Sequence, residues 1–189
     1  MRKLVYYVAT SIDGYIASPA GDFSAFPMEG DHFATIFGEF ADALPAPAIA
    51  GLGLSPTGER FDTVLMGWNT YAVGLPDLPD PYPHLRQYVF SRSHGPADVA
   101  PGITLAADPR ALVRELKAEE GGSDIWLCGG AQLAADLVDE IDTLILKVNP
   151  VLFGNGIPLL DGVYQPADFA LVSSRSFESG VLITTYERV

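Results

Sequence analysis

The sequence predicts an α/β protein with a mainly parallel central sheet and an antiparallel C-terminal hairpin. Short apolar segments alternate with segments of helical periodicity, as in sheets built from strand–helix–strand units. Residues 125–134 run from an apolar strand through the pair Gly129-Gly130 directly into a helical pattern. Near the C-terminus, two strand-like segments flank Glu178-Ser-Gly180, which is typical of a hairpin. The whole chain, residues 1–189, fits one domain.

Each element has its own local signal. Residues 4–9 form an apolar first strand, and Phe33, Phe37 and Phe40 recur at helical spacing in a predicted helix over 31–43. Asp108 suits an N-cap before Pro109, which begins a helix over 109–120. The remaining predicted strands are 63–66, 87–90, 103–106, 124–128, 143–153, 169–177 and 181–187, and the remaining helices are a short one from Trp68 and one over 131–140. Proline and glycine recur in 44–60 and 75–83, which we expect to be loops.

The composition excludes several classes of protein. Hydrophobic residues make up 48% of the chain and charged residues 19%, which excludes a disordered chain. A formal net charge of −13 disfavours nucleic acid and anionic membranes as partners. The polar start and the lack of a long apolar run predict a cytoplasmic protein.

Metal and hydrolase chemistry find no support in the sequence. Cys128 is the only cysteine and is best interpreted as a small buried side chain. The three histidines, His32, His84 and His94, lie in scattered contexts, so we expect no metal site. The sequence has no Gly-x-Ser-x-Gly motif.

Four segments, taken in order, carry a resemblance to a known family. They are the strand 4–9 leading into Thr10-Ser-Ile-Asp-Gly-Tyr-Ile-Ala17, the motif Met66-Gly-Trp-Asn-Thr-Tyr71, the strand 88–90 leading into Ser91-Arg92, and Gly129-Gly130. In this order they resemble the dihydrofolate reductase superfamily, and they are most similar to the branch that includes the riboflavin-biosynthesis reductase domain. The resemblance is weakest between residues 23 and 60. It implies the three-layer fold of that superfamily and an NADPH-dependent reductase acting on a small heterocycle or carbonyl compound.

Three of these segments are candidates for binding the cofactor's phosphates: the Gly129-Gly130 turn between strand and helix, the helix start after Gly67, and Ser91-Arg92. Gly67 lets a ligand approach the backbone, and Asn69 and Thr70 supply donors at the start of a helix. An arginine can hold a phosphate by two parallel charge-assisted bonds, with a serine hydroxyl and N–H beside it. The resemblance places the 2′-phosphate of NADP at Ser91 and Arg92, although an isolated Ser-Arg is more often an exposed loop.

The resemblance assigns further cofactor contacts. It implies that backbone groups of Ala9 and Ile16 meet the nicotinamide carboxamide. It also implies a cis peptide between Gly129 and Gly130, with Leu133 at the cofactor in the helix that follows. A glycine turn of this kind is otherwise a tight connection between strand and helix.

The chain departs from the family pattern at three positions. Trp68 stands where the family usually has arginine, which removes a charge from the phosphate end of the cofactor site. Tyr15 replaces a lysine of the riboflavin branch, which argues against the phosphorylated substrate of that pathway. Ala131 replaces a third glycine.

The proton donor is open to two candidates. Asp31 is the nearest match to the carboxylate that serves dihydrofolate reductases, but it also suits a helix N-cap, the interpretation we favour. Lys147 lies in the apolar strand 143–153, where it either faces solvent or faces the substrate and binds an anion or donates a proton. The substrate is then expected between the 31–43 helix, the 44–60 loop and Lys147.

Two other functions, nucleotide binding without turnover and flavin binding, are compatible with the sequence, as is a homodimer. The chain can be a nucleotide-binding or sensing protein that kept the fold and lost turnover, which Trp68 and the lack of a clear acid favour. Flavin binding is a further option that no particular residue indicates. The resemblance predicts a homodimer, with the β-rich segment 143–189 as its interface.

Overall fold

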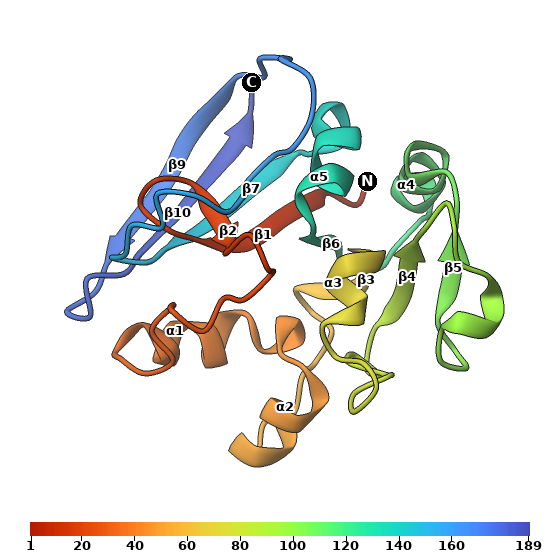
Figure 1. The fold of residues 1–189 in the computed structure, drawn as a ribbon, viewed down its shortest axis with the longest axis horizontal. Helices are drawn as coiled ribbons and strands as arrows, with labels where there is room; N and C mark the ends of the chain where they lie inside the picture. The colour runs from red at the N-terminus through yellow and green to blue at the C-terminus, as the bar shows by residue number, and fades with distance from the viewer.

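The computed structural model describes residues 1–189 and is built on one large sheet (Figure 1). The sheet has eight strands in the order β5-β4-β3-β6-β1-β7-β10-β9. The six strands from β5 to β7 in this order are parallel, whereas β10 and β9 add antiparallel pairs, which confirms the predicted fold class. Their bounds are β1 Leu4–Thr10, β3 Phe61–Gly67, β4 Arg86–Phe90, β5 Thr104–Ala106, β6 Asp124–Gly129, β7 Thr143–Val148, β9 Phe169–Ser176 and β10 Leu182–Arg188.

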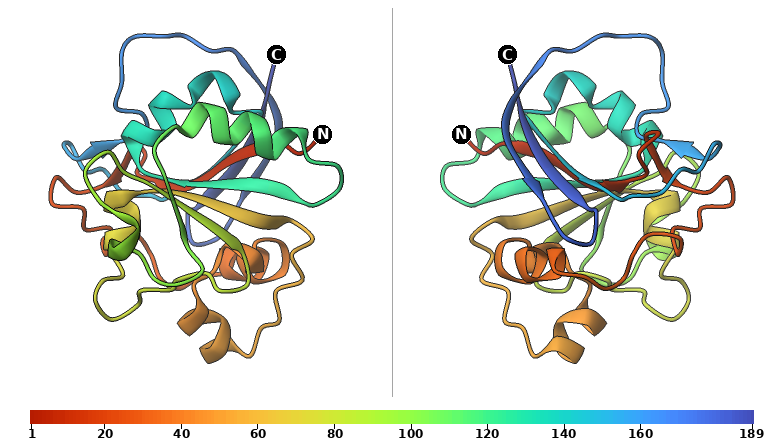
Figure 2. Two further views of the ribbon diagram at one scale, coloured as in Figure 1. Left: turned by 90° about the vertical axis from the view of Figure 1, so that its right-hand side faces the viewer. Right: turned by 90° about the vertical axis from the view of Figure 1, so that its left-hand side faces the viewer.

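Helices cover both faces of the sheet, which gives three layers. Figure 2 shows α4 (Pro109–Ala118) and α5 (Ala131–Asp136) on one face, and α1 (His32–Glu39), α2 (Ala46–Leu52) and α3 (Trp68–Ala72) on the other. Each face has its own hydrophobic core, and alternate side chains of β1 enter each: Leu4 and Tyr6 face α4 and α5, whereas Val5 faces the α1 side. No helix is both long and apolar enough to cross a membrane.

The predicted α4 cap is confirmed, because the Asp108 carboxylate accepts a hydrogen bond from the Ala111 N–H at 3.0 Å. Other boundaries differ from the prediction. The expected helix 31–43 ends at Glu39 and continues after Phe40 as a short 3₁₀ turn, Ala41–Ala43. Its buried positions are His32 and Ile36 rather than Phe33 and Phe37. The expected helix 131–140 is similarly interrupted at Leu137, and the expected strand 143–153 ends at Val148.

The expected loop 44–60 contains a helix, so that prediction is wrong. Pro47 lies in the first turn of α2, where the missing N–H would have no helical partner anyway. Gly53 ends the helix in the left-handed conformation, with φ 63°. Prolines and glycines therefore mark the ends of this helix, not the absence of one. A second, two-stranded sheet, β2 (Tyr15–Ala17) with β8 (Ile157–Pro158), was also not anticipated.

Candidate functional site

The carboxyl ends of five parallel strands meet at one edge of the sheet. Strands β4, β3, β6, β1 and β7 are consecutive neighbours, and the register pairs Gly67 with Phe90, Met66 with Gly129, and Ala9 with Lys147. Ligands of open α/β sheets bind outside such carboxyl ends. The candidate residues that the sequence scattered over the chain are thus gathered at this edge.

A cradle of glycines forms where β3 and β6 end. The Gly129–Gly130 peptide is cis, which confirms that expectation. A Cβ at Gly130 would lie 3.3 Å from Thr70 Oγ1, and one at Gly67 would lie 3.4 Å from the Gly130 nitrogen and 3.8 Å from Leu133 Cβ. These five predicted residues therefore surround one space that a side chain would fill, and backbone can approach a bound phosphate there. Asn69 lies exposed on α3 beside them.

The loop between β1 and β2 is fastened in place. The Ile12 N–H donates to Val151 O at 2.9 Å, and the Asp13 carboxylate accepts from the N–H groups of Phe153 at 3.1 Å and Gly154 at 2.7 Å. A hydrogen bond from the Ser11 hydroxyl, together with these, lowers the pKa of Asp13 to about 2. Half-buried Ala9 and Ile16 lie on either side of this fixed loop, in β1 and β2.

Ser91 and Arg92 begin the turn after β4. Arg92 is 86% exposed and has one carboxylate nearby, Asp136 at 3.4 Å. Ser91 is already engaged: its N–H donates to Ala106 O at 3.3 Å, and its hydroxyl lies 2.8 Å from His94 Nδ1. The His94 ring stacks on Trp68, with ring centroids 3.5 Å apart. His94 is not among the residues that the sequence predicts for the site. The only local trace of its contact with Ser91 is the spacing Ser-x-x-His after a strand.

Lys147 lies on the face of the sheet that α1 covers. Its ammonium is 5.8 Å from the centre of the Phe33 ring and forms no ion pair. Burial lowers the pKa of Lys147. Lys147 is therefore half-buried beneath α1 and does not point freely into solvent. A cation that is half-buried without a carboxylate is suited to meet an anion or to give up a proton.

Asp31 does not cap its helix, so the favoured interpretation of this residue is wrong. It occupies the residue before α1 but makes no side-chain cap bond. Its carboxylate instead accepts from the backbone N–H groups of Glu178 at 2.8 Å and Ser179 at 3.0 Å, in the turn between β9 and β10. These bonds, led by the one from Glu178, lower the pKa of Asp31. Both carboxylate oxygens of Asp31 thus accept hydrogen bonds from a turn that begins 147 residues further along the chain. No local sequence pattern predicts a contact over such a separation.

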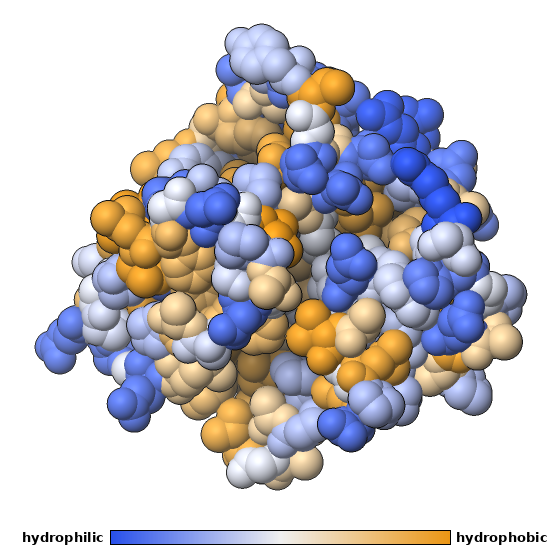
Figure 3. Space-filling view, in the orientation of Figure 1, coloured by the Kyte–Doolittle hydropathy of each residue, from blue (hydrophilic) through white to orange (hydrophobic).

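Aromatic side chains line the α1 face of the sheet. Tyr7 stacks on Phe40 at 4.4 Å, and the Arg60 guanidinium lies 4.4 Å from the centre of the Phe40 ring. A cavity of about 220 Å³ opens beside Arg60, between α1 and residues 54–60. Figure 3 shows apolar side chains on the hollowed part of this view, between the regions of β2 and α3. The cavity itself is lined mainly by polar residues, among them Glu39, Thr57, Glu59 and Arg60, so it suits a polar group of a ligand.

Cys128 is no nucleophile. Burial raises the pKa of the thiol to about 12, so it stays protonated next to Tyr82. This agrees with its interpretation as a small packed side chain. No group of three His, Cys, Asp or Glu side chains is arranged to hold a metal ion.

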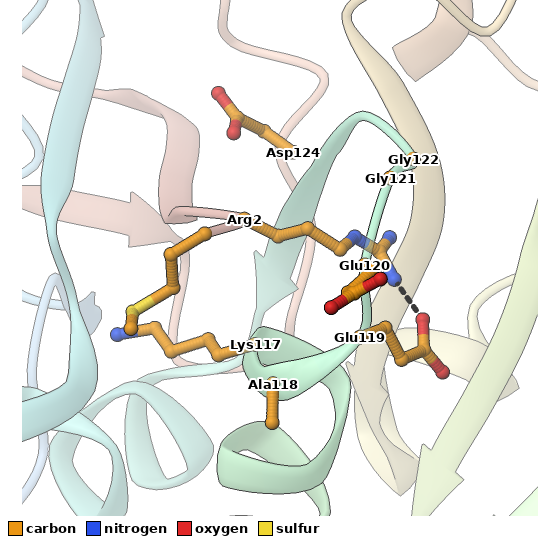
Figure 4. Close-up of a pocket in the computed structure, with 9 residues that line it drawn as sticks. Arg2, Lys117, Ala118, Glu119, Glu120, Gly121, Gly122 and Asp124 are labelled. Carbon is orange, nitrogen blue, oxygen red and sulfur yellow. Dashed lines mark hydrogen bonds and ion pairs between the residues drawn. The ribbon is translucent and has the colours of Figure 1, made fainter.

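A second cavity is remote from this edge. It measures about 410 Å³ and lies at the amino-terminal ends of β1 and β6, lined by Arg2, Lys117, Glu119 and Asp124 among others (Figure 4). The Arg2 guanidinium donates four hydrogen bonds, to Asp62, Glu119, Thr63 and the Ser123 carbonyl. Its charge holds strand ends together and is not available to a ligand.

The fold is that of the dihydrofolate-reductase-like class, with a group of glycines, Gly67, Gly129 and Gly130, at the carboxyl edge of its sheet. The chain belongs to the RibD C-terminal domain family, which it matches over residues 2–183. It is 32% identical over 186 residues to the uncharacterized protein YwjB of Bacillus subtilis (strain 168), covering 95% of each chain.

Solved structures share the fold. A putative riboflavin biosynthesis protein from Shewanella sp. PV-4 superposes with a TM-score of 0.71 at 24% identity, covering 100% of this chain and 99% of the other. A Thermotoga maritima diaminohydroxyphosphoribosylaminopyrimidine deaminase/5-amino-6-(5-phosphoribosylamino)uracil reductase gives a TM-score of 0.65 at 16% identity. This chain is fully covered there but spans 57% of that chain. Membership of the family supports an oxidoreductase.

Proposed function

We propose that this protein is an NADPH-dependent reductase that transfers a hydride to a small pyrimidine- or pterin-like heterocycle or a carbonyl compound. The observation that carries the proposal is the cradle of Gly67, Gly129 and Gly130 around Thr70 Oγ1, at the edge where Ala9 meets Lys147. Added side chains would fill this cradle, so its residues fit a dinucleotide. Family membership supports the same conclusion.

The chain's own groups would divide the task as follows. The glycine cradle and Arg92 hold phosphate, by close backbone approach and by charge-assisted hydrogen bonds. The loop fastened by Asp13 presents Ala9 and Ile16 to the nicotinamide end. When bound, NADPH supplies the hydride.

Lys147 is the proton donor or anion ligand of the proposal. Burial lowers the pKa of its ammonium, so it loses its proton more readily than an exposed lysine. Asp31 is less suited, because its carboxylate is held ionised by the 178–179 turn. The resemblance leaves the proton donor open between Asp31 and Lys147, and we therefore assign this role to Lys147.

A second candidate is a nucleotide-binding protein without turnover. One observation favours it: Trp68, not arginine, follows Gly67 and is covered by His94. The two candidates differ in a direct assay. The protein is mixed with NADPH and dihydropterins, pyrimidinones or ketones, and loss of NADPH is followed by absorbance.

If the protein is a reductase, we expect NADPH to be oxidised with at least one substrate class. Lys147→Met should lose this rate of oxidation and still bind NADPH. Binding of NADPH without any oxidation, combined with a co-purified nucleotide in the mass spectrum, would establish the second candidate instead. Absence of NADPH binding would contradict the reductase, and absence of any bound nucleotide as well would contradict both.

A further inference from the structure

The turn after β4 presents an imidazole where the resemblance places the cofactor's 2′-phosphate. His94 lies two residues after Arg92, half-buried, with its ring parallel to Trp68 at an interplanar angle of 11°. Trp68 is further contacted at its edge by Tyr71, with centroids 5.6 Å apart. One face of the indole is therefore occupied by the protein itself, and the His94 ring is fixed in orientation.

The hydrogen bonds of this turn determine which nitrogen of His94 carries the proton. The Ser91 hydroxyl oxygen accepts from the backbone N–H groups of Ser93 at 3.2 Å and His94 at 3.1 Å. Both of its lone pairs are thus used, and its own proton is left for His94 Nδ1 at 2.8 Å. The Ser93 hydroxyl lies 3.3 Å from the same nitrogen. Since Nδ1 accepts, the proton of the neutral ring is on Nε2.

The Nε2–H group is left without a partner inside the protein. No hydrogen bond of the turn involves Nε2. Nε2 is also not one of the buried nitrogen and oxygen atoms that lack a partner, so it is accessible to a ligand. His94 supplies a donor of fixed orientation, and the exposed guanidinium of Arg92 lies two residues before it in the same turn. A neutral donor and a guanidinium together are suited to bind a phosphate dianion. Ser91 itself has no donor to spare, because its N–H and its hydroxyl proton are both engaged.

We propose that His94 is a phosphate-binding residue that sets the preference for NADPH over NADH. It donates Nε2–H to the adenosine 2′-phosphate that Arg92 of the same turn also binds, and Trp68 and Ser91 orient its ring. His94 and Trp68 together replace the arginine that the family usually has after Gly67. The inference rests on the proposed function, because it requires that the cradle binds a dinucleotide.

The test separates the donor from the stacked ring. His94→Phe keeps an aromatic ring on Trp68 but has no N–H, whereas His94→Gln keeps an N–H donor and loses the ring. His84→Phe is the matched control, since His84 Nε2 bonds the Asp42 carbonyl and belongs to a different part of the fold. Calorimetric titrations use NADPH and NADH, and the fragments 2′,5′-ADP and 5′-AMP, while melts of the free variants confirm folding.

We expect His94→Phe to weaken NADPH and 2′,5′-ADP by about tenfold, as loss of one good hydrogen bond does. NADH and 5′-AMP should bind as before, and His94→Gln and His84→Phe should keep the preference for the phosphorylated ligands. Equal losses for both kinds of ligand, or loss in His94→Gln but not in His94→Phe, would overturn the inference.

The failure of this inference and that of the proposed function give different results. If the wild-type protein binds NADPH and His94→Phe binds it equally well, the assignment of His94 is wrong and the reductase proposal stands. If the wild-type protein binds none of the four ligands, the proposed function is wrong and the assignment of His94 is overturned with it.

Discussion

Lys147 and Ala9 are direct partners in the parallel ladder between β7 and β1. Partners in such a ladder project their side chains to the same face, so the Lys147 ammonium emerges beside the backbone expected to meet the nicotinamide. Ile183 of β10 pairs with Lys147 on its other side. The lysine thus lies between the apolar Ile183 and the candidate reaction centre, which is consistent with its partial burial and its proposed role.

Replacing Lys147 should separate stability from activity. We expect Lys147→Met to raise the melting temperature at neutral pH, because it removes a half-buried cation that has no ion pair, and to lower turnover at least tenfold. The matched control is Lys117→Met. Lys117 is similarly buried but pairs with Asp142 at 2.7 Å, so its loss should lower the melting temperature. A lower melting temperature in Lys147→Met would contradict the prediction.

The pH dependence follows from the same pKa shift. The pKa of Lys147 is lowered from 10.5 on folding, so between the folded and unfolded values the unfolded chain binds more protons. The destabilisation is therefore complete below the folded pKa and is relieved as pH rises through it. Chemical denaturation at a series of alkaline pH values should show a smaller rise of stability with pH in Lys147→Met than in wild type.

Asp31 should matter for the hairpin and for acid stability. Asp31→Ala removes both acceptors of the Glu178 and Ser179 N–H groups and should lower the melting temperature at neutral pH. Because folding lowers its pKa, the stabilisation is present above the unfolded pKa of 3.8 and is lost as pH falls through the folded value. The melting temperatures of wild type and Asp31→Ala should therefore converge in acid.

Asp31→Asn, which keeps one acceptor, should retain turnover. A complete loss of turnover would restore Asp31 as the proton donor.

Arg92 should contribute to phosphate selectivity without contributing to folding. Losing a charge-assisted phosphate contact costs about 1.5–3 kcal/mol, so Arg92→Ala should weaken NADPH by about tenfold or more. NADH should be nearly unaffected, and the melting temperature of the free protein should not change, because Arg92 is 86% exposed and its ion pair with Asp136 is long. Equal losses for NADPH and NADH in titrations would exclude the 2′-phosphate assignment.

Gly130 should be required for the ligand and not for the fold. A Cβ there meets only the Thr70 hydroxyl, at 3.3 Å, and its φ of −89° suits any residue. Gly130→Ala should therefore cost less than about 1 kcal/mol of folding stability and abolish the melting-temperature increase on adding NADPH. Gly122→Ala is the structural control: its φ is +81° and its Cβ would lie 2.7 Å from Asp62, so it should destabilise the protein and keep the NADPH shift. A destabilised Gly130→Ala with a normal shift would make the glycine structural.

The homodimer is predicted to form through β9. This strand is an edge of the sheet, and its side chains Leu171 and Val172 are 58% and 57% exposed. Unprotected edges with exposed apolar residues pair readily with a second strand. Light scattering should give twice the chain mass of 20.2 kDa at micromolar concentrations, and Leu171→Glu should give one chain mass. Thr104→Glu on β5, the opposite edge, should leave the dimer intact. A monomeric wild type would contradict the prediction.

Sequence patterns were sufficient wherever a strand and its turn carry their own signal. The strand ends at Gly67 and Gly129 were recognised because glycine after an apolar run marks a turn, and the parallel sheet then brought them together. Asp31 was misinterpreted because an aspartate before a helix looks like a cap, whereas its real partners are at residues 178–179. Helix α2 is not evident from composition alone, because proline and glycine break a helix in its interior but are compatible with its first turn and its C-cap, where Pro47 and Gly53 lie.

The role of His94 illustrates what local patterns cannot supply. Its bond to Ser91 is local and could be suspected from the spacing, but its stacking on Trp68 depends on β3 and β4 being neighbours. A single histidine without its partner carries no functional signal. Sites assembled from the ends of different strands are in general visible only once the strand order is known.

The placement of the two tryptophans gives the protein a pair of independent optical reporters. Trp126 is 5% exposed and donates its indole N–H to the Tyr7 carbonyl, so its emission reports whether the core is formed. Trp68 lies against His94 in the candidate cofactor site, so its emission reports changes in that turn. In a Trp126→Phe background the fluorescence comes from Trp68 alone, and ligand occupancy can be followed spectroscopically while the chain stays folded.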